Sequence, residues 1–265
     1  MLPTISLIGI PTDQHSSFSR GPAKAPAAIR AALASAHGNN ASERGSEIGS
    51  DFQLLDRGDV AIAEDAGDDD RIRAAIAACP TRIIALGGDH AISFPVVEAL
   101  ARRHGAFDIL HFDAHPDLYD ELDGNRRSHA SPFARIMEGG HARRLLQVGI
   151  RTLNRHCREQ AARFGVEIIE ARHFNSSWRP RFDRPVYVSI DIDVLDPAFA
   201  PGVSHHEPGG LNVRDVINIL LDLDAPIVGG DVVEYNPDCD VNGMTAVVAA
   251  KLVKELAAAM AANPA

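Results

Sequence analysis

The stretch Ile109-Leu110-His111-Phe112-Asp113-Ala114-His115-Pro116-Asp117 runs from an apolar segment directly into acidic and imidazole side chains. A second stretch, Val186-Tyr187-Val188-Ser189-Ile190-Asp191-Ile192-Asp193, has the same design. Each apolar segment is typical of a buried strand, in which residues two apart lie on the same face. Acidic and imidazole groups crowded together without a cation would repel one another and lose solvation. The two stretches therefore predict a pair of divalent metals at the end of a parallel sheet.

The rest of the chain alternates apolar segments with helical patterns. We expect strands at Ile5–Ile10, Arg82–Leu86, Asp108–Phe112, Leu145–Val148, Val166–Ile169, Val186–Ile190 and Ile227–Val233. We expect helices at Pro26–Ala34, Arg71–Ala78, Ser93–His104, Pro132–Gly139, Arg155–Phe164, Val213–Leu223 and Ala246–Ala262. Strands separated by helices predict an α/β fold with a parallel sheet covered on both faces. The polar segment His37–Asp51 predicts an exposed loop, and residues 1–265 are expected to form a single domain.

The composition limits the partners and the compartment. The formal net charge of −10 argues against a partner held by phosphate contacts, so no nucleic acid is expected. The three cysteines are scattered without a Cys-x-x-Cys pair, which favours a reducing compartment. No apolar run reaches the ~18 residues of a membrane span, and residues 1–10 lack the basic start of a signal or transit peptide. We therefore expect a cytoplasmic protein without a membrane partner.

Further candidate ligands follow other predicted strands. Gly87-Gly88-Asp89-His90 follows one of them, and Glu234 follows another. Ligands bind beyond the carboxyl ends of parallel strands, so these residues belong with the two stretches above. Asp89 is best explained as the cap of a helix that begins near Ala91. The candidate metal ligands are His90, Asp113, His115, Asp117, Asp191 and Asp193.

The donor atoms limit the choice of metal. Carboxylate and imidazole ligands without a thiolate favour Mn²⁺, while Zn²⁺, Co²⁺ and Ni²⁺ stay open. Two such ions ~3.5–4 Å apart would lower the pKa of a bridging water molecule and generate hydroxide near neutral pH. The aspartates would balance the charge of two divalent ions, so the site would tolerate or attract a cationic substrate.

Four motifs occur in order along the chain. They are Gly87-Gly88-Asp89-His90, Asp113-Ala114-His115-Pro116-Asp117, Ser189-Ile190-Asp191-Ile192-Asp193-Val194-Leu195-Asp196-Pro197 and Glu207-Pro208-Gly209-Gly210-Leu211. Together they resemble the ureohydrolase family, which comprises arginases, agmatinases and related guanidino hydrolases. The likeness begins near Ser16 and ends near Ala246, so it covers nearly the whole chain. Runs such as Ser128-His129-Ala130-Ser131 and Ala200-Pro201-Gly202-Val203-Ser204-His205 resemble the plant-type arginases in particular.

The resemblance implies a fold, a cofactor and a product. The fold is a three-layer α/β/α sandwich with a mostly parallel sheet of about eight strands, the cofactor is two Mn²⁺ ions, and the product is urea. By the family pattern, His90 and Asp117 would serve one metal and His115 and Asp193 the other, with Asp113 and Asp191 as bridging carboxylates. The resemblance also implies a homo-oligomer, either a trimer or a hexamer.

The resemblance further suggests the catalytic residues His129, Asp117 and Glu234. Asp117 would orient the nucleophilic hydroxide and accept its proton. His129 resembles the mobile acid/base histidine of the family, and the pKa range of histidine suits proton transfer. Glu234 would bind the guanidinium group, because a carboxylate accepts two parallel N–H bonds from that planar group.

The nature of the substrate beyond its guanidinium group stays open at this stage. Arginine is the first choice, and agmatine and 4-guanidinobutyrate are the alternatives. Asn125 resembles a residue that binds the α-carboxylate in arginases, and with the neighbouring Arg127 and Ser128 it would hold a carboxylate end. The acidic residues within 120–123 favour instead a substrate with a terminal ammonium.

Two other classes of protein are alternatives. An inactive family member could bind a metal or a small molecule as a regulatory or scaffold subunit, although every ligand and His129 are present. A two-metal hydrolase of an amide or a phosphoester is the other alternative. A phosphoester site would be expected to have more basic residues near the metals than this sequence provides.

Overall fold

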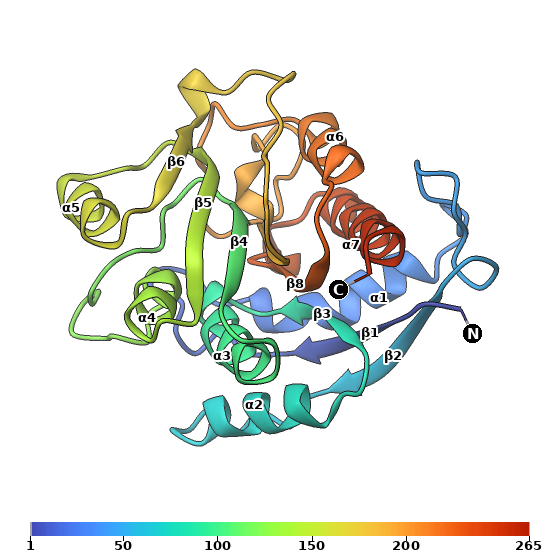
Figure 1. Ribbon diagram of the computed structural model, residues 1–265, viewed down its shortest axis with the longest axis horizontal. Helices are drawn as coiled ribbons and strands as arrows, with labels where there is room; N and C mark the ends of the chain where they lie inside the picture. Colours follow the sequence, from blue (N-terminus) through green and yellow to red (C-terminus); the bar gives the residue numbers. More distant parts are fainter. Residues whose placement is uncertain (1, 265) are drawn as a thin grey trace.

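One parallel sheet forms the centre of the computed structural model, which describes residues 2–264 (Figure 1). Within those residues eight strands lie in the order β2-β1-β3-β8-β7-β4-β5-β6, and every neighbouring pair is parallel. The strands are β1 (Thr4–Ile10), β2 (Gln53–Asp59), β3 (Arg82–Gly87), β4 (Phe107–Phe112), β5 (Ala142–Ile150), β6 (Glu167–Glu170), β7 (Val186–Asp191) and β8 (Ile227–Val233). The expected parallel sheet of about eight strands is confirmed.

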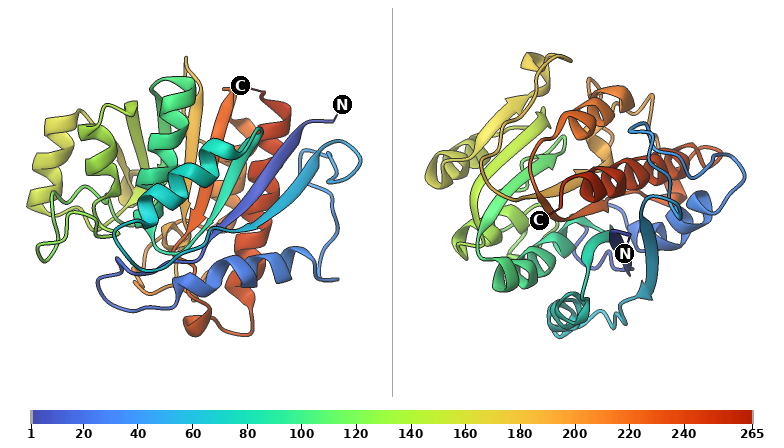
Figure 2. Two further views of the ribbon diagram at one scale, coloured as in Figure 1. Left: turned by 90° about the horizontal axis from the view of Figure 1, so that it is seen from below. Right: turned by 45° about the vertical axis from the view of Figure 1, so that its right-hand side comes forward.

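Helices cover both faces of this sheet (Figure 2). They are α1 (Ala25–Leu33), α2 (Asp68–Ala78), α3 (Ser93–His104), α4 (Pro132–Glu138), α5 (Arg155–Phe164), α6 (Val213–Asp222) and α7 (Met244–Ala262), with short 3-10 turns at Pro22–Lys24, His90–Ile92, Ala171–His173, Ile192–Val194 and Pro237–Cys239. Helices α1, α6 and α7 pack on one face, and α2, α3, α4 and α5 pack on the other, which confirms the three-layer α/β/α sandwich. None of the helices in residues 2–264 combines the length and the hydropathy that a membrane crossing needs.

The alternation of side chains along each strand creates two separate apolar cores. In β3, Ile84 and Leu86 join the core beneath α1 and α7, whereas Ile83 and Ala85 join the core beneath α2 and α3. Because both faces of the central strands are buried, these strands are apolar throughout, and the sequence pattern locates them well.

The two edge strands of the sheet have a different character. Strand β2 was not among the strands expected from the sequence. It lacks an apolar pattern, because it is largely exposed and carries charged residues such as Asp56, Arg57 and Asp59. Charged side chains on an edge strand oppose pairing with another chain. The opposite edge, β6, is only four residues long and both begins and ends with glutamate. The predicted loop His37–Asp51 lies outside the helices and strands, as expected.

The order of the strands places the carboxyl ends of β3, β8, β7 and β4 side by side. After β3 and β4 the chain passes to α3 and α4 on one face, and after β7 and β8 it passes to α6 and α7 on the other. Such a divergence opens a crevice at the carboxyl edge of the sheet. Pro3 and Asn263, near the two ends of the chain, hydrogen-bond to the segments where β2 and β8 begin, at the opposite edge (Figure 2).

Gly230 in β8 permits a close approach between β8, β7 and α7. A Cβ atom at this position would lie 2.5 Å from the Val188 carbonyl oxygen and 2.9 Å from Leu256 Cδ2. We expect Gly230→Ala to lower the free energy of unfolding by about 2–3 kcal/mol, because relief of the overlap would open the packed core. Urea unfolding followed by circular dichroism measures the change. The matched control is Gly38→Ala, whose Cβ would meet nothing within 4 Å, and equal stability of the two variants would contradict this account.

Candidate metal centre

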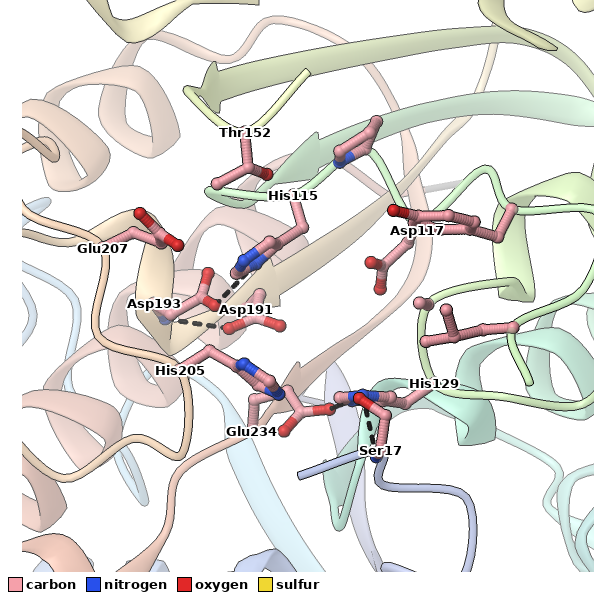
Figure 3. Close-up of a pocket in the computed structure, with 14 residues that line it drawn as sticks. Ser17, His115, Asp117, His129, Thr152, Asp191, Asp193, His205, Glu207 and Glu234 are labelled. Carbon is pink, nitrogen blue, oxygen red and sulfur yellow. Dashed lines mark hydrogen bonds and ion pairs between the residues drawn. The ribbon is translucent and has the colours of Figure 1, made fainter. Parts of the chain in front are cut away.

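A cavity opens at the carboxyl edge of the sheet, where the candidate ligands gather (Figure 3). Its lining residues are Ser17, His115, Pro116, Asp117, Tyr119, Leu122, His129, Ala130, Thr152, Asp191, Asp193, His205, Glu207 and Glu234. Five of these residues carry a carboxylate, and neither lysine nor arginine is among the lining residues of the described chain. The cavity therefore has a strong excess of acidic groups and would attract cations.

His90 is at the centre of the first ligand cluster. Its Nδ1 atom lies 3.2 Å from Asp113 Oδ2, 3.1 Å from Asp117 Oδ2 and 3.2 Å from Asp191 Oδ2. All four residues are buried. His90 follows β3, Asp113 and Asp117 follow β4, and Asp191 ends β7, so three strands aim these side chains at one point.

His115 is at the centre of the second ligand cluster. Its Nδ1 atom lies 2.9 Å from Asp193 Oδ2 and 3.4 Å from Asp113 Oδ1. Asp113 thus presents one oxygen to His90 and the other to His115, as a carboxylate shared by two sites would. The structure brings all six predicted metal ligands into two adjoining clusters.

The surroundings of the His90 Nδ1 atom fit a bound cation. This buried atom has no aligned hydrogen-bond partner within residues 2–264, although three carboxylate oxygens surround it. Burial, together with the neighbouring Asp193 and Asp113 carboxylates, raises the pKa of Asp191 well above its usual value. A divalent cation would bond the nitrogen and offset the repulsion between the carboxylates. Because the donors are imidazole nitrogen and carboxylate oxygen, the residues present fit such a cation.

A buried relay fixes the proton of His90 on the other ring nitrogen. The fully buried Asp231 of β8 accepts hydrogen bonds from the hydroxyl groups of Ser189 at 2.6 Å, Tyr187 at 2.7 Å and Ser93 at 2.6 Å. Because Ser189 donates to Asp231, its oxygen accepts from His90 Nε2, which lies 2.9 Å away. The proton of neutral His90 is therefore on Nε2, and the Nδ1 lone pair is left for a cation.

His111 supports a ligand and is not itself available as one. Gln147 Nε2 lies 2.6 Å from the carbonyl oxygen of Pro116, which can only accept, and 3.0 Å from His111 Nδ1. His111 therefore carries its proton on Nε2 and donates it to Asp113 Oδ2 at 2.8 Å. Its ring nitrogen is near enough to His90 and Asp113 to share an ion with them, but both of its nitrogens already have partners. The sequence interpretation missed this residue, although its position two before Asp113 was an available signal.

Two cavity residues have a left-handed backbone conformation. The φ angle is 49° at Asp117 and 63° at Glu234, which is unusual for residues other than glycine. Hydrogen bonds on both sides of the cavity hold these conformations: Phe133 N–H donates to the Asp117 carbonyl at 3.2 Å, and Glu234 N–H donates to the Gly88 carbonyl at 2.9 Å. Strain held by its surroundings is typical of functional sites.

His129 and Glu234 form a pair on the cavity wall. His129 Nδ1 lies 2.8 Å from Glu234 Oε1, and the same oxygen accepts the backbone N–H of His90 at 2.8 Å. Burial lowers the pKa of His129, but the carboxylates of Glu234 and Asp89 outweigh it and raise this pKa to about 9. Asp89 is the cap that the sequence predicts, since it accepts the N–H of Ala91 at 3.1 Å.

The three residues expected to hold the substrate tail do not line the cavity. The Arg127 guanidinium makes hydrogen bonds of 2.8 and 2.6 Å to Asp69 and lies 4.9 Å from the centre of the Phe94 ring. Asn125 Oδ1 accepts the N–H of Arg127 at 2.8 Å, and the buried Ser128 hydroxyl accepts a backbone N–H at 3.3 Å. Each of these groups has a partner within the protein, and their part in binding the substrate tail stays a prediction.

Besides Ser17, four lining residues with polar side chains were given no role from the sequence. Tyr119, Thr152, His205 and Glu207 come from three loops, which meet only in the folded chain. His205 and Glu207 lie in runs that carry the family resemblance, which was the one available signal. The Nε2 atom of His205 is buried and has no hydrogen-bond partner within residues 2–264.

The sequence matches the Arginase family over residues 3–259. It is 55% identical over 274 residues to "Arginase 1, mitochondrial" of Arabidopsis thaliana, covering 96% of this chain and 80% of that protein. It is 52% identical over 278 residues to "Arginase, mitochondrial" of Medicago truncatula, covering 97% and 82%. The solved structure of an arginase from Medicago truncatula superposes with a TM-score of 0.92 at 49% identity, covering 97% of this chain and 87% of that one.

The relatives correct the expected location of the protein. The arginases from Arabidopsis thaliana, Medicago truncatula and Oryza sativa are named mitochondrial, which points to an organelle and not to the cytoplasm. The cytoplasmic expectation is wrong because it rests on residues 1–10, most of which form β1 of the folded domain. Residues that form a core strand carry no information about the compartment.

Ser189 offers a direct test of the relay behind His90. We expect Ser189→Ala to weaken Co²⁺ binding about 10–100-fold, because His90 loses the group that fixes its tautomer. Titration followed by the visible d–d absorption of Co²⁺ measures this affinity. Ser93→Ala is the matched control, since the Ser93 hydroxyl bonds the same Asp231 carboxylate, and the bond of Ser93 to the His90 carbonyl comes from its backbone N–H, which alanine keeps. The relay has no role in metal binding if both variants bind Co²⁺ as the unmodified protein does.

Proposed function

Because this chain belongs to the arginase family, whose members are hydrolases that act on guanidino groups, we propose that it hydrolyses arginine to urea and ornithine. The observation that carries this proposal is the buried Nδ1 atom of His90 among three carboxylate oxygens, beside a second cluster around His115. The choice of arginine is supported by relatives named arginase that are 55% and 50% identical over most of this chain.

Two Mn²⁺ ions are the proposed cofactor, with other divalent metals as alternatives. His90 and Asp117 would hold one ion and His115 and Asp193 the other, and Asp113 and Asp191 would lie between the two. When bound, the ions would supply a nucleophile from water near neutral pH. The hydrogen bond between Ser189 and His90 and that between His111 and Asp113 would keep the His90 nitrogen and the Asp113 carboxylate oriented toward the ions.

Glu234 is the proposed anchor of the guanidinium group. Its Oε1 atom is held by His90 N–H and His129, so the carboxylate has a fixed orientation on the cavity wall. Its Oε2 atom accepts no hydrogen bond within residues 2–264 and would take an N–H of the planar guanidinium. The guanidinium carbon would then face the two ligand clusters across the cavity.

Asp117 and His129 are the proposed proton carriers. Asp117 lines the cavity next to the first ligand cluster, where it would orient the nucleophile and accept its proton. His129 lines the wall beside Glu234, where it would deliver a proton to the leaving amine. Urea and a neutral amine product leave once that proton is transferred.

Agmatine is the second candidate substrate, and a feature of the cavity favours it. Among the described lining residues there is no lysine or arginine to bind the carboxylate of arginine, and Glu207 adds an acidic group. The preference for arginine therefore rests on the named relatives and not on the loop at 120–128. 4-Guanidinobutyrate is third, because it keeps a carboxylate in the same acidic cavity. The trimer or hexamer and the single domain over residues 1–265 stay predictions.

Urea release from three compounds tests the substrate. We expect Mn²⁺-loaded protein to show a kcat/KM for arginine about 100-fold above those for agmatine and 4-guanidinobutyrate, because selective enzymes discriminate through groups that differ between substrates. A higher kcat/KM for agmatine would transfer the assignment to an agmatinase. An enzyme that binds the metal and releases urea from none of them would support the inactive, metal-binding alternative.

Two variants separate the proposed proton carrier from the proposed ligand. His129→Ala is expected to lower kcat about 100-fold or more with an unchanged metal content, because it removes an acid and no ligand. Asp193→Asn is expected to lose both activity and bound metal, because a carboxylate of the second cluster becomes neutral. Metal analysis of both proteins after dialysis distinguishes these outcomes. A full metal complement in Asp193→Asn would remove that residue from the ligand set.

A further inference from the structure

The loop after β1 is fastened to the active-site wall. Asp13 Oδ2 accepts the N–H of Gly21 at 2.7 Å, which closes the loop on itself. Asp89 Oδ2 accepts the N–H of His15 at 2.9 Å, and the His15 carbonyl accepts the N–H of His129 at 3.1 Å. The segment between Asp13 and Gly21 therefore has a fixed position beside the His129 loop.

Ser17 lies in this segment and contacts the ring of His129 twice (Figure 3). The backbone nitrogen of Ser17 is 3.1 Å from His129 Nε2, and the Ser17 hydroxyl oxygen is 2.8 Å from the same atom. On the other side of the ring, His129 Nδ1 is 2.8 Å from Glu234 Oε1. Both nitrogens of His129 are therefore held, one by each of two segments distant in sequence.

The backbone contact decides which nitrogen carries the proton. A backbone N–H can only donate, so His129 Nε2 must accept from Ser17. The proton of neutral His129 is then on Nδ1, where it is donated to Glu234. The tautomer with its lone pair on Nε2 is the one that can take up a proton at Nε2 and later release it.

The Ser17 hydroxyl has a property that the backbone N–H lacks. It can donate to Nε2 when His129 is neutral and accept from Nε2 when His129 is protonated. Glu234, Asp89 and Asp117 face His129 and favour its protonated form, whereas the neighbouring His205 and the Ser17 N–H oppose it. The hydroxyl is thus the group at Nε2 that can partner either form.

We propose that Ser17 is a positioning residue that holds His129 Nε2 in line with the cavity in both protonation states. This inference rests on the proposed function, because it matters for turnover only if His129 transfers a proton. It assigns to the loop after β1 a part in the chemistry that neither the motifs nor the predicted ligand set include.

Chemical labelling tests the contact without reference to activity. Diethyl pyrocarbonate adds to an unprotonated imidazole nitrogen, and the tryptic peptide Ser128–Arg135 contains His129 as its single histidine. We expect Ser17→Ala to label this peptide about 5–10-fold faster than the unmodified protein, because Nε2 loses its hydroxyl partner. Ser17→Thr, which keeps the hydroxyl, should label at the original rate. An unchanged rate in Ser17→Ala would overturn the proposal.

Steady-state kinetics test the consequence for turnover. Ser17→Ala should lower kcat about 10-fold with KM changed less than twofold, and Ser17→Thr should restore kcat. The alkaline limb of the kcat profile should move to lower pH in Ser17→Ala, because protonated His129 loses the acceptor of its Nε2 proton and its pKa falls. An unchanged kcat and pH profile would show that Ser17 plays no part in turnover.

The matched control is Ser19→Ala in the same loop. The Ser19 hydroxyl donates to the Arg20 carbonyl at 3.3 Å and makes no contact with His129 within residues 2–264. Its labelling rate and kinetics should equal those of the unmodified protein, and a change like that of Ser17→Ala would contradict a specific role for Ser17. If the unmodified protein releases no urea, the proposed function fails, and the labelling rates still decide whether Ser17 holds Nε2.

Discussion

Repulsion among buried carboxylates is the constraint on which the rest of this molecule depends. Asp113, Asp117, Asp191 and Asp193 meet within two adjoining clusters, and the described lining of the cavity offers them imidazoles but no lysine or arginine. Uncompensated charges of one sign are costly away from water. A folded chain that keeps these groups together would therefore gain stability from a bound cation, which would couple metal binding to folding.

A row of polar side chains lies in the sheet two residues before the ligands. Ser189 of β7 lies in register with His111 of β4 on one side and Asp231 of β8 on the other. These three residues form a polar row across adjacent strands in an otherwise apolar region. The row orients His90 and Asp113 from behind, so the position of each proton is determined by the strand register and not by the metal. Polar side chains buried in the central strands away from water each need a hydrogen-bond partner. Asp231 meets this need by accepting hydrogen bonds from three hydroxyl groups.

Much of this arrangement could be predicted from the sequence, and the limits have physical causes. The buried central strands and the ligands at their ends, such as His90 and Asp191, could be predicted, because an apolar run followed by acidic or imidazole residues is a local signal in the sequence. Strand β2 could not be predicted, because an edge strand with charged residues has no apolar pattern. The ion pair between Arg127 and Asp69 of α2 was also not predictable, because the two residues are far apart in the sequence and meet only in the folded chain. The contact of Ser17 with His129 joins positions 112 residues apart, and no spacing rule relates them.

The charged margins of the sheet have a consequence for how copies of this chain can meet. Both outermost strands present acidic side chains: β2 with Asp56 and Asp59, and β6 with Glu167 and Glu170. Arginines pair with these acids, Arg30 at the β2 margin and Arg144 and Arg172 at the β6 margin, so a strand added at either margin would have to pack against charged side chains, which disfavours fibril growth by strand addition. Charged edges of this kind favour contacts between copies through helical and loop surfaces over a sheet shared by two molecules.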